Sequence, residues 1–203
     1  MSILLIRNGE TALNAARIVQ HPETPLNERG IGQAQRLAAR LADFPIAGIV
    51  SSDYKRAQMT AEAIAEATGL PITIQESLRE RNFGDARGLA HGDLGFDLYA
   101  PDFHPRGGES WPVFHERVAV AWTEVVARAA GTDGDLVVVS HALVCRSLVE
   151  HQLTLGTEQD ASVPRWPNTA LTVIEQRAPW RISVLACGAH LDSEVADDPA
   201  ARS

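Results

Sequence analysis

The sequence predicts an α/β fold with three layers, in which helices pack on both faces of a mostly parallel central sheet. Two observations support this prediction. Short runs of apolar, β-prone residues alternate along the chain with segments whose apolar residues recur at helical spacing, and such alternation is typical of βαβ units. Several of these runs are continuously apolar, as strands are when both faces of a parallel sheet are covered.

The first unit runs from a strand into a helix. Residues 3–6 are a continuous apolar run and predict the first strand. Asn27 is suited to cap a helix, since its side chain can accept a hydrogen bond from a free backbone N–H in the first turn. Apolar residues then recur at helical spacing from Ile31 to Leu41, and Pro45 lies just beyond the expected end of the helix.

The second unit repeats this order. Residues 46–50 predict a second strand, and small apolar side chains recur on one side of an expected helix over residues 53–67. Gly69 follows that helix as a stop signal. Residues 72–74, an Ile-Thr-Ile run, predict the third strand.

Residues 81–110 interrupt the alternation. Glycines and prolines punctuate this stretch without a sustained period, so we expect an inserted lid or rim. Ser110 is suited to cap the long helix that follows, with Pro112 in its first turn and inward-facing residues as far as Ala129.

The last elements complete the predicted sheet. Residues 136–139 are the clearest buried strand, and a helix over residues 142–153 follows. Residues 170–174 and 182–185 predict the last two strands. From Gly188 onward the sequence is small, polar and acidic, so residues 188–203 are expected to be a flexible tail.

Length and charge limit the function classes. A chain of 203 residues is expected to form one domain with its own core, which we place at residues 1–187. The net charge of −8 argues against binding to nucleic acid or to an anionic membrane surface, because both require clustered Lys and Arg. A site for an anionic substrate must therefore be locally positive. The sequence has no metal-ligand spacing, Walker A loop or dinucleotide-binding turn, so we expect no metal and no cofactor.

The sequence also indicates a compartment. The apolar run at residues 3–6 is followed at once by Arg7 and Glu10, and it is too short for a signal-peptide core or a membrane span. The two cysteines, Cys145 and Cys187, do not form a disulfide framework, which suits a reducing environment. We therefore expect a cytoplasmic protein. The sequence leaves open whether it forms a homodimer.

Polar side chains follow four of the predicted strands where each strand ends. Arg7 and Asn8 follow the first strand, Arg56 the second, Glu80 the third and His141 the fourth. Because ligands of open α/β sheets bind beyond the carboxyl ends of the strands, we expect these side chains to meet there. Arginine and histidine can neutralise the oxygens of a phosphoryl group, and a carboxyl group can supply the proton for its leaving group.

Five segments of the chain carry a family resemblance. They are Arg7-Asn8-Gly9-Glu10-Thr11 with Asn14; Pro25-Leu26-Asn27-Glu28-Arg29-Gly30 with Gln33-Ala34; Ser52-Asp53 with Arg56-Ala57 and Thr60-Ala61; Leu78-Arg79-Glu80 with Phe83-Gly84; and Ser140-His141. In this order, with the site segments at the predicted strand ends, they resemble the histidine phosphatase superfamily, the phosphoglycerate mutase-like proteins. The resemblance extends to about residue 175.

The resemblance implies a two-step phosphoryl transfer. In the family, the histidine of an Arg-His-Gly-Glu-Thr signature attacks phosphorus and forms a phosphohistidine, which water or a second acceptor then releases. It implies that Glu80 protonates the leaving group and later activates water. The groups that it implies bind the phosphoryl oxygens are Arg7, Arg56 and His141, with Asn14 and the backbone N–H of Ala142 as further donors.

Asn8 stands at the nucleophile position, where this chain departs from the family signature. An amide nitrogen shares its lone pair with the carbonyl group, so it is not appreciably nucleophilic and no phosphoramidate should form. We therefore predict phosphate-ester binding with very low turnover. Two origins of Asn8 stay open: an inactivated form of a phosphatase, or a natural pseudophosphatase that binds a phosphorylated ligand or partner.

The inserted segment bears on the reaction and on the substrate. The mutases of the family carry a longer and more basic segment here, whereas only Arg87 and Arg106 are basic in residues 85–110. A phosphatase acting on a small phosphorylated metabolite is therefore favoured over a phosphoglycerate mutase-type phosphotransferase. Sugar phosphates, phosphoglycerates and nucleotide-derived esters all stay open. Side chains that could reach the pocket are His91, Phe96, Tyr99, Phe103, His104 and Arg106.

Overall fold

A computed structural model describes residues 1–156 and 166–191. Its strands form one six-stranded sheet in the order β3-β2-β4-β1-β5-β6. They are β1 (Ser2–Arg7), β2 (Ile46–Ser51), β3 (Ile72–Ile74), β4 (Asp135–Ser140), β5 (Leu171–Glu175) and β6 (Ile182–Cys187). The first four strands in this order run parallel, β5 pairs antiparallel with β1, and β6 pairs antiparallel with β5. The predicted α/β fold with a mostly parallel sheet is confirmed.

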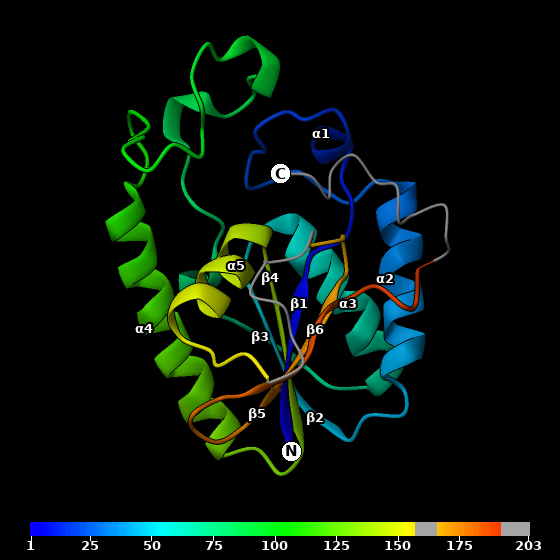
Figure 1. The fold of residues 1–203 in the computed structure, drawn as a ribbon. Coiled ribbons are helices and arrows are strands. Elements are labelled where there is room, and N and C mark those ends of the chain that lie inside the picture. Colours follow the sequence, from blue (N-terminus) through cyan, green and yellow to red (C-terminus); the bar gives the residue numbers. More distant parts are fainter. Residues whose placement is uncertain (157–165, 192–203) are drawn as a thin grey trace.

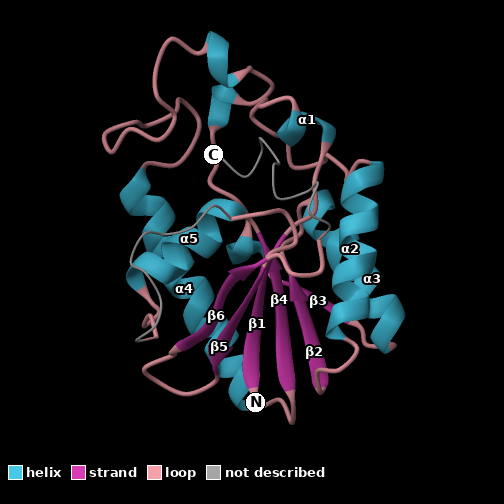
Figure 2. Ribbon diagram, turned by 45° about the vertical axis from the view of Figure 1, so that its right-hand side comes forward, coloured by secondary structure: helices cyan, strands magenta, loops and turns pink. Residues whose placement is uncertain are grey.

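Helices cover both faces of the sheet, as Figures 1 and 2 show. The α-helices in the described residues are α1 (Ala12–Ala15), which lies beyond one end of the sheet, α2 (Glu28–Leu41), α3 (Lys55–Thr68), α4 (Trp111–Ala130) and α5 (Ala142–His151). The helices α2 and α3 lie on one face, while α4 and α5 lie on the other. The chain therefore has the three layers that the sequence predicts.

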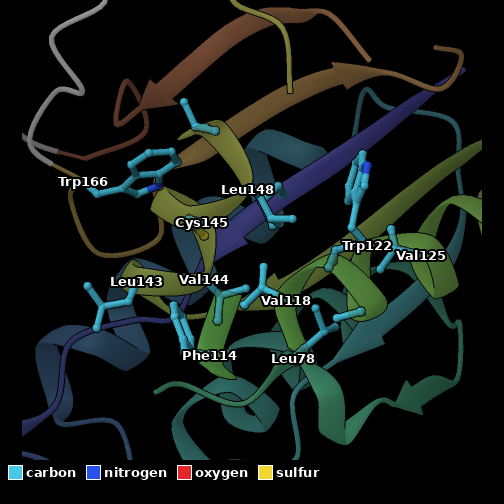
Figure 3. Close-up of a cluster of buried hydrophobic side chains, with 14 of the residues drawn as sticks. Leu78, Phe114, Val118, Trp122, Val125, Leu143, Val144, Cys145, Leu148 and Trp166 are labelled. Carbon is cyan, nitrogen blue, oxygen red and sulfur yellow. The ribbon is translucent and has the colours of Figure 1, made fainter. Parts of the chain in front are cut away.

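The core follows from the alternation of side chains along the central strands. In β1, Leu4 and Ile6 pack on the side of α2 and α3, and Ile3 and Leu5 pack on the side of α4 and α5. Figure 3 shows the second of these clusters, where Phe114, Val118 and Trp122 of α4 meet Val144 and Leu148 of α5. Burial on both faces explains why these strands are continuously apolar.

The helix boundaries follow capping groups. The Asn27 side chain accepts a hydrogen bond of 2.8 Å from Gly30 N, which confirms it as the cap of α2. Ser110 likewise caps α4. The helix expected from residue 53 instead begins at Lys55, because Tyr54 is still extended. The short α1, which has no apolar period, was not apparent from the sequence.

The segment over residues 81–110 carries two short 3-10 helices, Gly84–Ala86 and His91–Asp93. It is held to the domain by its own buried side chains, since Leu94 and Leu98 belong to the core cluster around α4. Of the tail predicted at residues 188–203, only residues 188–191 lie within the described residues, and Leu191 N donates to Gly188 O.

No helix in the described ranges is both long enough and apolar enough to cross a membrane.

Candidate active site

A pocket of about 80 Å³ lies beyond the carboxyl ends of the central strands. It forms there because β1 and β4 are parallel and in register, with Arg7 opposite Ser140. The predicted site residues on its wall are Arg7, Asn8, Asn14, Arg56, Glu80 and Ala142. The remaining one, His141, lies beside Asn8 and is not part of the wall.

Asn8 is fixed in one orientation by its neighbours. Its Nδ2 donates to Gly9 O at 2.8 Å, so its Oδ1 faces His141 Nδ1 at 3.1 Å. The backbone N–H of Asn8 donates to Ser140 O, and its carbonyl accepts from Asn168 Nδ2. The amide is therefore an ordered part of the pocket, with both of its polar atoms in hydrogen bonds.

These contacts also set the tautomer of His141. Because Asn8 Oδ1 can only accept, His141 Nδ1 carries the proton, and Nε2 accepts from Ser52 Oγ at 2.9 Å. Burial holds the pKa of His141 well below its usual 6.5, and the positive charges of Arg56, Arg117 and Arg7 lower it further. His141 is thus neutral, and both ring nitrogens are used inside the protein.

Two buried guanidinium groups supply positive charge to the pocket. Arg7, at the end of β1, donates to Trp166 O. Arg56, in the first turn of α3, donates to His21 O at 3.0 Å. Burial lowers the pKa of Arg56 to about 10, and nearby Arg87 and Arg7 act in the same direction. Arg56 keeps its charge at neutral pH, so both arginines can bind an anion.

Glu80 is placed to hold a proton. Its Oε1 accepts from Arg81 N at 3.0 Å and its Oε2 from Leu143 N at 3.2 Å. Burial raises the pKa of Glu80 above the usual 4.5, while these two N–H groups and the charge of Arg56 partly oppose that rise. A carboxyl group with a raised pKa at the wall of a pocket can act as a general acid.

Two further polar groups face the same space. Asn14 lies in α1, and its Oδ1 is buried without a hydrogen-bond partner in the described part of the chain. Ala142 is the first residue of α5, so its N–H belongs to a helix N-terminus, where the dipole favours negative charge. Asn14 Oδ1 can only accept a hydrogen bond, so the donors that these positions offer to the oxygens of a bound ligand are Asn14 Nδ2 and the backbone N–H of Ala142.

The loop after β1 is seated directly on α2. Glu10 N donates to Gln33 Oε1 at 2.9 Å, and Gly9 N donates to Thr60 Oγ1 at 3.0 Å. Gly30 allows the helix to approach so closely that a Cβ there would lie 2.1 Å from Glu10 O. The backbone that carries Asn8 is thereby fixed against two helices.

Sequence reasoning missed several residues of the wall. Of the side chains expected from the inserted segment, His91 and Tyr99 line the pocket, whereas Phe96, Phe103, His104 and Arg106 do not. The polar residues that were not singled out as wall residues are Arg17, Gln20, Tyr54, Arg81 and Arg87. Arg87 had one signal, its being one of two basic residues in residues 85–110.

Tyr54 joins several of these groups. Its ring lies 5.3 Å from that of His141 and 5.1 Å from the guanidinium carbon of Arg56. Its hydroxyl accepts from Arg87 Nη2 at 3.2 Å. Within residues 1–156 and 166–191, no three His, Cys, Asp or Glu side chains gather closely enough to hold a metal ion.

The sheet order and an arginine-rich pocket at the ends of β1 and β4 define an α/β protein of the phosphoglycerate mutase-like class. The chain belongs to the histidine phosphatase superfamily (branch 1), whose family pattern matches residues 3–186. It is 34% identical to phosphoglycerate mutase-like protein 4 of Arabidopsis thaliana, over 94% of this chain and 86% of that protein. It is 33% identical to the adenosylcobalamin/alpha-ribazole phosphatase of Salmonella typhimurium, over 76% of this chain and 81% of that protein.

Solved structures resemble the whole domain. Bacillus stearothermophilus YhfR superposes with a TM-score of 0.80 at 27% identity, over 94% of this chain and 99% of that one. A mycobacterial glucosyl-3-phosphoglycerate phosphatase in complex with VO3 superposes with a TM-score of 0.76 at 28% identity, over 90% of this chain and 97% of that one.

Proposed function

We propose that this chain binds the phosphoryl group of a small phosphorylated metabolite and hydrolyses the ester very slowly. The observation that carries the proposal is the convergence of Arg7, Arg56 and Glu80 on a pocket that Asn8 also lines. The resemblance of the Arg7–Thr11 segment to the family signature implies that Asn8 stands at the nucleophile position. The phosphoryl group would lie over Asn8, with its oxygens on the two arginines. Asn14 and the N–H of Ala142 would supply further donors.

Each chemical role follows from the surroundings of the group. Glu80, whose pKa is raised by burial, would donate a proton to the leaving oxygen. Both polar atoms of the Asn8 amide are held in hydrogen bonds, so Asn8 would neither attack phosphorus nor take up a proton. Binding and electrostatic stabilisation would persist without a covalent intermediate. Comparable losses in a serine protease leave about 10³–10⁴-fold acceleration over water.

His141 has a conditional role in this proposal. The resemblance implies that it binds a phosphoryl oxygen, yet both of its ring nitrogens are occupied by Asn8 and Ser52. It would reach the ligand only after one of these bonds breaks. Until then it would act on the site by holding Asn8 in place.

Hydrolysis is favoured over transfer to a second acceptor. Two of the similar proteins carry names of phosphatases acting on small phosphorylated compounds, although others carry the name of a probable phosphoglycerate mutase. The short inserted segment, with only two basic residues in residues 85–110, supports the phosphatase.

Restoring an imidazole tests the proposal. In Asn8→His, the ring Nδ1–H could donate to Gly9 O as the Asn8 amide does now, leaving Nε2 directed at the pocket. Hydrolysis of p-nitrophenyl phosphate should rise by more than about 10³-fold, given the roughly 10⁶-fold loss seen when a protease nucleophile is removed. An acid-labile phosphoenzyme should form in this variant only. Asn8→Ala is the control and should stay at the basal rate, and an unchanged rate for Asn8→His would overturn the assignment.

A further inference from the structure

The pocket contains more positive charge than one phosphoryl group requires. Arg17, Arg81 and Arg87 line it together with Arg7 and Arg56, whereas Glu80 is the single carboxyl group among its described wall residues. The Arg81 guanidinium group already donates to the carbonyls of Leu98, Phe103 and Glu109, which leaves Arg17 and Arg87 for a ligand. A phosphate monoester carries about two negative charges at neutral pH. The two buried arginines suffice to balance it, so Arg17 and Arg87 remain as a surplus.

The surplus is not compensated by the protein itself. Ion pairs in the described ranges involve Arg29, Lys55, Arg79, Arg106, Arg117 and Arg146. Neither Arg17 nor Arg87 forms an ion pair within residues 1–156 and 166–191, although the chain has 26 Asp and Glu residues. Because these two cations line a pocket whose described wall has one carboxyl group, the pocket is suited to a further external anion.

Arg87 stands beside the phosphoryl-binding groups. Its Nη2 donates to the Tyr54 hydroxyl at 3.2 Å, and the guanidinium carbon of Arg56 lies 5.1 Å from the centre of the Tyr54 ring. The charge of Arg87 lowers the pKa of Arg56 in addition to the larger effect of burial. One tyrosine therefore separates Arg87 from the first arginine pair, so one small molecule could contact both places.

The backbone that carries Arg17 and Arg87 is paired. Gly88 N donates to Val19 O at 2.8 Å, Val19 N to Leu89 O at 3.0 Å, and His91 N to Arg17 O at 2.9 Å. Gly88 has φ +83°, a conformation that favours glycine, and a Cβ there would lie 3.1 Å from the His21 ring. The two segments of this rim are thus held against each other, so little ordering is left to occur on binding.

We propose that Arg87, which lines the same pocket as Arg17, binds a second anionic group of the substrate. The chain would then select phosphorylated metabolites that carry a carboxylate or a second phosphate, and it would discriminate against phosphate esters of neutral alcohols. The second group would lie against the guanidinium group of Arg87 while the first phosphate lies on Arg7 and Arg56. This inference rests on the proposed phosphoryl-binding function and names its substrate class.

Calorimetric titration of the unaltered chain tests the inference, because slow turnover permits equilibrium binding. Two matched pairs isolate the second charge and its source: glycerol 3-phosphate against 3-phosphoglycerate, and fructose 6-phosphate against fructose 1,6-bisphosphate. In at least one pair, the compound with two anionic groups should bind about tenfold more tightly than the compound with one. One charge-assisted hydrogen bond provides a difference of this size. Which pair responds tells whether a carboxylate or a second phosphate is bound.

Variants distinguish a failure of this inference from a failure of the proposed phosphoryl-binding function. Arg87→Gln should abolish the preference and change the affinity for inorganic phosphate less than about twofold, a limit well below one charge-assisted hydrogen bond. Arg106→Gln is the matched control: it lies in the same segment, its side chain is 93% exposed, and it should keep the preference. Three results would each overturn the inference. The unaltered chain could show no preference, the preference could survive Arg87→Gln, or Arg87→Gln could lower the affinity for inorganic phosphate as much as the affinity for the compound with two anionic groups. Failure of the unaltered chain to bind inorganic phosphate would instead overturn the proposed function.

Discussion

The substitution Gly30→Ala tests how the loop that carries Asn8 is held. A Cβ at this position would lie 2.1 Å from Glu10 O and 2.8 Å from Glu10 N. Favourable contact needs about 3.5 Å, so the loop or α2 must move by more than about 1 Å. Overpacking of this kind costs about 1–3 kcal/mol, and the higher end is expected because the opposing atoms are backbone. Since Glu10 follows Asn8 and Gly9, the same shift would deform the pocket.

Gly32→Ala is the matched control in the same helix. The nearest atom to its added Cβ is Arg36 Nη1 at 3.5 Å, at the end of a flexible side chain. This variant should gain about 0.5–1 kcal/mol from the lower backbone entropy of the unfolded chain. The melting temperature of Gly30→Ala should be lower than that of the unaltered chain by about 2–12 °C, and this variant should bind inorganic phosphate more weakly. The melting temperature of Gly32→Ala should be unchanged or raised. Equal melting temperatures and phosphate affinities for the two variants would refute the close-contact argument.

Two other predictions concern partly buried arginine contacts and pH. Arg117→Leu removes bonds of 2.7–2.8 Å to Glu109 and to the carbonyls of Ser77 and Arg79. It should destabilise the fold by about 2–4 kcal/mol in urea unfolding, against less than about 0.5 kcal/mol for Arg106→Gln; a loss below about 1 kcal/mol would contradict this. The folded pKa of His141 is depressed, so the unfolded chain takes up the proton first and stability falls as pH drops below about 7. His141→Gln should remove up to about 1.4 kcal/mol per pH unit from that slope between pH 7 and 5, and an unchanged slope would show that His141 titrates normally.

Local sequence signals were sufficient for most of the fold. The capping side chains of Asn27 and Ser110 act on their own first turns, and the apolar runs state directly which strands are covered on both faces. The direction of the last two strands was not predictable in this way. An apolar run such as residues 171–175 has the same pattern whether it pairs parallel or antiparallel, and only the path of the chain decides.

The sequence predicted which segments of the chain form the site, but not how every side chain in them is oriented. Strand ends meet at one edge, so Arg7, Arg56 and Glu80 could be brought together from their positions in the sequence. The orientation of the His141 side chain could not be predicted in this way. It depends on contacts with Ser52 and Asn8, which are separated from His141 by 89 and 133 positions in the sequence. The place of Arg87 on the pocket wall had only its basic character as a signal, and a basic residue in an irregular segment is usually solvated.

Arg81 gives the inserted segment a property that composition would not suggest. Its buried guanidinium group donates to the carbonyls of Leu98, Phe103 and Glu109, and lies 3.8 Å from the centre of the Trp111 ring. These bonds close loops of 17, 22 and 28 residues, the task that a disulfide performs in small secreted domains. Unlike a disulfide, this cross-link needs no oxidant and vanishes from the unfolded chain, so it orders the segment only once the core beneath it has formed.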